Sequence, residues 1–140
     1  MKKALALVPV LLVAAIVVSC ISAQPAYPLG QQFSLAIGET AGISGEDLAI
    51  RFVDVAGDSR CPTGVVCIWA GQVDCLVDLT SGGSTTRAQF TEPGLTTSAG
   101  AQSFKAFQFS FTVAPYPEAG KPIARGDYRL NITVSKAPAS

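Results

Sequence analysis

Apolar and polar residues alternate along most of the chain after residue 32, and this spacing of two constrains the fold more than any other feature. The clearest run covers residues 107–113, where three phenylalanines and a valine fall on one face and Gln108, Ser110 and Thr112 on the other. The same alternation recurs at residues 33–37, 48–52, 73–79 and 128–134. Such alternation is typical of β-strands that bury one face and expose the other.

Turn signals separate these runs and lead to a predicted architecture. Glycine or proline turns stand at residues 38–39, 81–84 and 92–94. We expect a return strand at residues 85–90, a polar loop at residues 95–101, and a β-bulge where the alternation slips between Phe52 and Val55. Six or seven strands without a helical segment predict an all-β fold, a single antiparallel β-sandwich of the immunoglobulin-like kind. A small β-barrel is the alternative, because the Cys…Trp…Cys spacing of immunoglobulin domains is absent.

The first 20 residues are predicted to be a signal peptide. Two lysines precede an apolar run at residues 4–18, which is shorter than the roughly 20 residues of a membrane span. The run closes with Val-Val-Ser-Cys, which resembles a bacterial lipobox, so we expect a lipoprotein signal and diacylation of Cys20, with palmitate as a typical acyl group. Cleavage after Ala23, or a retained signal anchor, are the alternatives.

Removal of this segment defines the mature chain. We expect residues 21–32, which contain two prolines, to form a tether, and residues 33–136 to form the β-sandwich domain. The lost lysines leave eight basic against ten acidic residues, and no basic run, so a nucleic-acid partner is not expected. The predicted location is the cell membrane or outer membrane, on the extracytoplasmic side and held by the N-terminal lipid, with a partner protein in the cell envelope as a further expectation.

The segment at residues 58–71 carries two of the four cysteines and the only tryptophan. In an oxidising compartment Cys61 and Cys67 are expected to form a disulfide. Cys75 shares the inward face of its strand and is expected to be a buried thiol; a reactive or intermolecular cysteine, or pairing with Cys61 or Cys67, are the alternatives. The chain has no histidine, so we expect no metal, no cofactor and no serine–histidine triad.

Three other residues of this segment are candidates for binding. Asp58 is expected to accept backbone hydrogen bonds in a turn, and Arg60 either pairs with Asp58 or lies on the indole of Trp69. In the second interpretation Arg60 and Trp69 are exposed anchors for a partner. Asp74 and Asp78 lie four residues apart on one strand face, a weak indication of paired acids.

The same segment carries a resemblance. Its pattern, D-S-R-C-P, four variable residues and then C-x-W-A-G, resembles the signature of small, mostly uncharacterised secreted or lipid-anchored bacterial domains. The segments at residues 115–117 and 127–130 are similar to the C-terminal half of that family, while Cys75 stands where the family has a valine-like residue. The resemblance implies a location outside the cytoplasm and no known reaction.

Two classes of function follow. The first is a non-enzymatic binding or structural module, and the second is a protease-inhibitor-like module that presents the disulfide-closed loop 61–67. Exposure of residues 62–66 would favour the inhibitor, and burial of that loop between sheets would favour the structural role. An enzyme ranks third, because it requires a pocket that gathers Asp58, Arg60 and a further acid.

Overall fold

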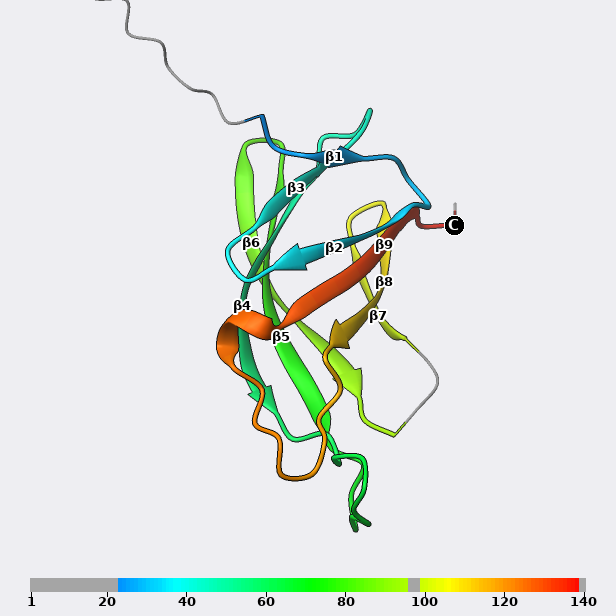
Figure 1. The fold of residues 1–140 in the computed structure, drawn as a ribbon. Helices are drawn as coiled ribbons and strands as arrows, with labels where there is room; N and C mark the ends of the chain where they lie inside the picture. The colour runs from blue at the N-terminus through cyan, green and yellow to red at the C-terminus, as the bar shows by residue number, and fades with distance from the viewer. Residues whose placement is uncertain (1–22, 96–98, 139–140) are drawn as a thin grey trace, which may run out of the picture.

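The alternating runs form strands in the computed structural model, which describes residues 23–95 and 99–138. Two sheets pack face to face, in the strand orders β1-β3-β4-β5-β6 and β2-β9-β8-β7 (Figure 1). The strands of the first sheet are β1 (Ala26–Tyr27), β3 (Thr40–Ile43), β4 (Ala49–Asp58), β5 (Gln72–Ser81) and β6 (Ser84–Pro93). Those of the second are β2 (Gln32–Ala36), β9 (Arg129–Lys136), β8 (Phe107–Ala114) and β7 (Gly100–Phe104), and the 3-10 turn η1 (Arg125–Asp127) precedes β9. The predicted β-sandwich is confirmed, and the sheets do not close into a barrel.

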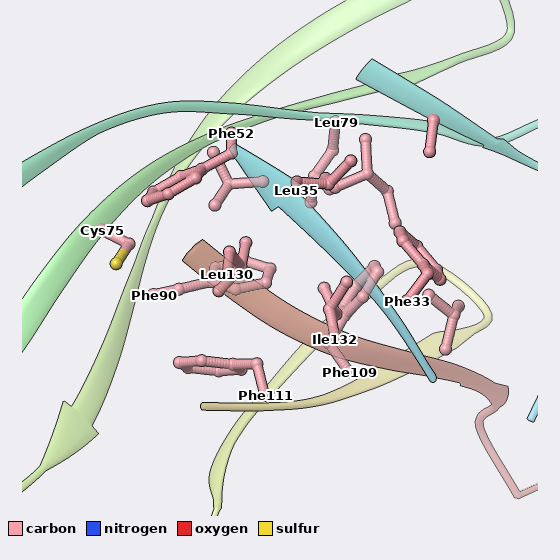
Figure 2. Packing of buried hydrophobic residues seen from close by; sticks show 14 of the residues in the cluster. Phe33, Leu35, Phe52, Cys75, Leu79, Phe90, Phe109, Phe111, Leu130 and Ile132 are labelled. Atoms are coloured by element: carbon pink, nitrogen blue, oxygen red, sulfur yellow. The ribbon is translucent and has the colours of Figure 1, made fainter. Parts of the chain in front are cut away.

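The core lies between the two sheets and consists of the inward residues of the alternating strands. The inward side chains of β5, including Cys75, are fully buried. Phe90 of β6 packs against Phe109 and Phe111 of β8, with ring centroids 5.4 and 4.9 Å apart (Figure 2). Each of these side chains contributes about 1.5–3 kcal/mol by leaving water. The alternation therefore fixes which face of each strand meets the other sheet.

Three short strands beyond the predicted ones complete the sheets, and two of them are β3 and β7. β3 pairs with β4, and β7 pairs with β8, so residues 100–101 lie in a strand and not in the predicted loop. Gly100 of β7 sits against the ring of Phe111, where a Cβ atom would come within 2.5 Å of the ring. These strands are short and rich in Gly, Ala, Ser and Thr, so they lack the alternation that revealed the others. The predicted bulge is confirmed by a shift in the β4–β5 register between Phe52 and Asp54.

The expected start of the domain at residue 33 is wrong, because the preceding segment belongs to the sandwich. β1 pairs parallel with β3, and the Gly30 amide donates to the Val134 carbonyl. The ring of Tyr27 stacks on Phe33 at 4.4 Å. Parallel pairing depends on a distant strand, which residues 24–32 alone do not reveal. The predicted tether therefore cannot extend over residues 26–32.

The two ends of the sandwich differ in what they carry. β1 lies at one end, and the loop between β4 and β5 extends from the opposite end, beside the loop between β8 and β9 (Figure 1). In the described part of the chain, no helix is long and apolar enough to cross a membrane. Cys20 and the predicted signal peptide lie outside the described residues.

Candidate functional site

The loop between β4 and β5 holds the sequence motif and continues the hairpin beyond the sheet. The Ser59 amide donates to the Gln72 carbonyl at 2.8 Å, and the Cys61 amide donates to the Ala70 carbonyl at 3.0 Å. Gly71 has φ 69°, and a Cβ atom there would lie 1.8 Å from the Ser59 carbonyl oxygen. The motif therefore requires glycine at this position, because two backbones meet where the loop leaves the sheet.

The disulfide Cys61–Cys67 is present and closes a small ring at the end of this loop. Cys61 is buried and Cys67 is exposed. Within the ring Gly64 adopts φ 89°, so the chain turns there. The Thr63 amide donates to Pro117, and the Ala119 amide donates to Thr63, both at 3.0 Å. The ring is thus fixed by its own disulfide and by the neighbouring β8–β9 loop.

Four large apolar side chains of this loop face solvent, and we call them the apolar tip: Val65, Val66, Ile68 and Trp69. Val66 is fully exposed, Ile68 is 94% exposed and Trp69 is 82% exposed. No charged residue occurs from residue 61 to residue 73. A cluster of exposed apolar side chains on a soluble domain commonly marks an interaction site. The loop at residues 62–66 is largely exposed, the condition expected of a presented loop rather than a buried one.

Arg60 behaves differently from the tip, because it is buried at 3% exposure. Its Nε and Nη2 donate to the two carboxylate oxygens of Asp58, at 2.9 and 2.6 Å. Nη1 donates to the Val113 carbonyl at 2.7 Å and Nη2 to the Pro115 carbonyl at 3.0 Å. Arg60 therefore joins the end of β4 in one sheet to the end of β8 in the other.

This arrangement corrects the interpretation of Arg60 as an exposed anchor. The expected pairing with Asp58 is confirmed, but the guanidinium lies 5.0 Å from the ring centroid of Tyr116 and not on Trp69. A bidentate partner and two carbonyl acceptors at the sheet ends draw Arg60 inward, whereas Trp69 follows the disulfide outward. Of the two, only Trp69 remains a candidate for contact with a partner.

Two further groups complete the buried polar network around Arg60. Burial would raise the pKa of Asp58, but hydrogen bonds from Arg60 and Tyr128 outweigh it, so this pKa lies below its ordinary value. Burial raises the pKa of Tyr128 to about 12, with the Asp58 charge adding to the effect. Burial also raises the pKa of Glu92, although its carboxylate accepts from the Val113 amide at 2.7 Å and lies 3.8 Å from Arg60. In the described residues every buried side-chain nitrogen and oxygen has a partner.

The remaining candidates are occupied within the fold. Cys75 is a free thiol buried in the core, and burial raises its pKa to about 12, which keeps it protonated. Asp74 accepts from the Thr91 hydroxyl at 2.6 Å, and Asp78 accepts two hydrogen bonds from Arg87 at 2.8 and 3.0 Å. The two aspartates thus serve separate cross-strand contacts. Across residues 23–95 and 99–138, no three His, Cys, Asp or Glu side chains gather closely enough to hold a metal ion.

The sequence patterns do not predict several residues of this site. No motif marks Val66 and Ile68, although they stand in an uncharged run beside the disulfide. Glu92, Tyr116 and Tyr128 join the Arg60 network from distant strands and loops, and only the similarity at residues 115–117 and 127–130 pointed toward two of them. Comparison with known proteins found no matching family model, no similar curated protein and no similar solved structure.

Proposed function

We propose that this protein is a lipid-anchored β-sandwich of the cell envelope that acts as a non-enzymatic binding module, with the apolar tip as its contact surface for a partner protein. The observation that carries the proposal is the exposure of Val66, Ile68 and Trp69 on a closed, hydrogen-bonded loop. The buried Arg60 network supports the proposal, because it fixes the base of the loop and leaves the apolar tip exposed.

The energetics favour contact with a hydrophobic pocket. Full burial of one such aliphatic side chain is worth about 1.5–3 kcal/mol. Tryptophan is also among the residue types that dominate binding hot spots. The loop is already ordered by its disulfide and by the hydrogen bonds of Thr63, so less conformational freedom is lost on binding.

The position of the tip supports a partner away from the membrane. Only five residues separate Cys20 from β1, so the six steps from Cys20 to Ala26 reach at most about 22 Å. β1 lies at the end of the sandwich opposite the tip (Figure 1). A chain lipidated at Cys20 would therefore hold the domain close to the membrane with the tip directed outward.

The protease-inhibitor-like function is the second candidate, and the exposure of residues 62–66 favours it. The shape of the loop opposes it, however. Gly64 turns the chain with φ 89°, whereas extended segments are the ones that add to a partner as a β-strand. The tip as a whole, rather than an extended strand, is the better contact surface.

A capture experiment from envelope extract tests the proposed function. The full-length protein with Val66→Ser and Ile68→Ser is expected to retain its melting temperature, because both side chains are exposed, and to capture its partner at least about tenfold less well. Leu76→Ser, on the outer face of β5, is the control that removes an aliphatic side chain elsewhere and is expected to capture the partner normally. Equal capture by the tip variant and wild type would refute the proposed surface.

A further inference from the structure

A shallow groove of about 730 Å³ lies beside the base of the loop, between the end of β4 and the start of β5. Trp69 forms part of its wall, and Gln72 and Asp74 of β5 contribute polar side chains. Gly57 of β4 also lines the groove, and a Cβ atom at this glycine would meet no atom within 4 Å. The groove therefore combines an exposed indole, two polar side chains and open space.

The polar side chains are held in place by the sheet. The Asp74 carboxylate accepts from the Thr91 hydroxyl at 2.6 Å and from the Gln72 amide at 3.1 and 3.0 Å. The hydrogen bond from Thr91 is the main cause of an Asp74 pKa below the ordinary value, so the group stays ionised at neutral pH. A carboxylate has about four lone-pair sites, and the Gln89 side chain supplies a further hydrogen bond to Asp74, so a ligand hydroxyl would replace one of these donors. The Gln72 side chain is exposed, and its carbonyl oxygen remains available as an acceptor while its nitrogen donates to Asp74.

We propose that this groove binds a neutral saccharide, with Trp69 as the platform for a pyranose ring and with Asp74 and Gln72 as hydrogen-bonding partners for its hydroxyls. A pyranose has an apolar face of C–H groups and a rim of hydroxyls. An indole supplies a wide, flat apolar surface on which the C–H face of a pyranose can pack, with an N–H donor at its edge. The side chains beside it supply the acceptors and donors that the rim requires.

The charge of the groove selects among saccharides. Its charged lining residues are Asp58 and Asp74, and no lysine or arginine lines it. The nearby Arg60 is buried and bonded to Asp58, so it does not offset the negative charge at Asp74. Saccharides that carry carboxylates or sulfates are therefore disfavoured, and neutral sugars are accepted.

This site goes beyond the proposed function, because it uses the flank of Trp69 and not the rest of the apolar tip. Val66 and Ile68 do not line the groove, and Gln72 and Asp74 do not belong to the tip. Single substitutions can therefore distinguish saccharide binding in the groove from partner binding at the apolar tip. Ile68→Ser is expected to weaken the contact with the partner protein and to leave saccharide binding unchanged, while Gln72→Ala is expected to do the reverse.

The test is a titration of the full-length protein in detergent micelles with cellotetraose and tetra-N-acetylchitotetraose, with tetragalacturonate as the anionic control. Trp69 is the only tryptophan, so its fluorescence reports on the groove directly, and calorimetry supplies a second readout. We expect a saturable response to at least one neutral tetrasaccharide and none to tetragalacturonate. Asp74→Asn and Gln72→Ala are expected to weaken binding about tenfold, whereas Asp78→Asn, on the same face of β5, is not.

A variant that fills the groove guards against loss of the fold. Gly57→Leu is expected to abolish the response with an unchanged circular dichroism spectrum, because the added side chain enters open space. The proposal is overturned by any of three results: no saturable response to either neutral tetrasaccharide, equal binding of tetragalacturonate, or wild-type binding in both Asp74→Asn and Gly57→Leu.

Discussion

Arg60 shows how one buried side chain can join the two sheets at one end of the sandwich. It contacts Asp58 at the end of β4 and the carbonyls of Val113 and Pro115 at the end of β8, so it links the two sheets across the core. The pairing with Asp58 could be predicted from two nearby residues of opposite charge. The burial and the distant acceptors could not, because both depend on how the sheets meet. A residue that only stabilised a turn would contribute about 1 kcal/mol or less to the free energy of unfolding. The contribution of Arg60 is therefore expected to be larger.

Replacement of Arg60 tests its role as a link between sheets. Arg60→Ala leaves Asp58 buried without its partner, and loss of one member of a buried pair typically costs about 3–5 kcal/mol. Arg60→Lys cannot make the bidentate contact and should restore only part of the stability. Urea denaturation measures these changes. Arg87→Ala is the matched control, because the Arg87–Asp78 pair is exposed, and such pairs are worth about 1 kcal/mol or less. A loss in Arg60→Ala no larger than in Arg87→Ala would contradict the assignment.

The β4–β5 loop shows, at the scale of an element, where sequence patterns succeed and fail. The spacing of Cys61 and Cys67 predicted the disulfide, and the glycine of the motif marks the close approach at Ser59. Exposure of Trp69 was one of two interpretations of the sequence, but the pattern did not predict that Val66 and Ile68 are exposed, since apolar residues beside a strand usually enter the core. Their exposure follows from the ring and from its hydrogen bonds to Pro117 and Ala119, which are distant in sequence. The ring therefore directs the indole of Trp69 away from the sheet and into solvent.

Removal of the disulfide tests this description of the loop. The double variant Cys61→Ala, Cys67→Ala is expected to lose roughly 2 kcal/mol of unfolding free energy through loop entropy. Because Trp69 is already 82% exposed, its emission maximum should not shift, whereas a buried indole would shift to the red. Thermal denaturation and tryptophan fluorescence of the oxidised and variant proteins measure both effects. A large red shift would show that the indole is shielded in the folded protein.

At the scale of the whole molecule, the sandwich follows from its long strands. The alternating runs predicted β2, β4, β5, β8 and β9 because each buries one face against the other sheet. The short strands β1, β3 and β7 escaped prediction, since they complete sheet edges through partners elsewhere in the chain. As a result, β1 lies at one end of the sandwich and the loop that carries the apolar tip lies at the other. The proposed outward-facing contact depends on this arrangement.

Site-specific photo-crosslinking in cells that make the full-length protein tests whether the apolar tip is the contact surface. A photoreactive amino acid replaces Ile68 in one experiment and Gln108, exposed on the outer face of β8, in the other. We expect a discrete protein adduct from position 68 that is absent from position 108 and is lost when Val66→Ser and Trp69→Ala are added. No adduct from position 68, or the same adducts from both positions, would contradict it.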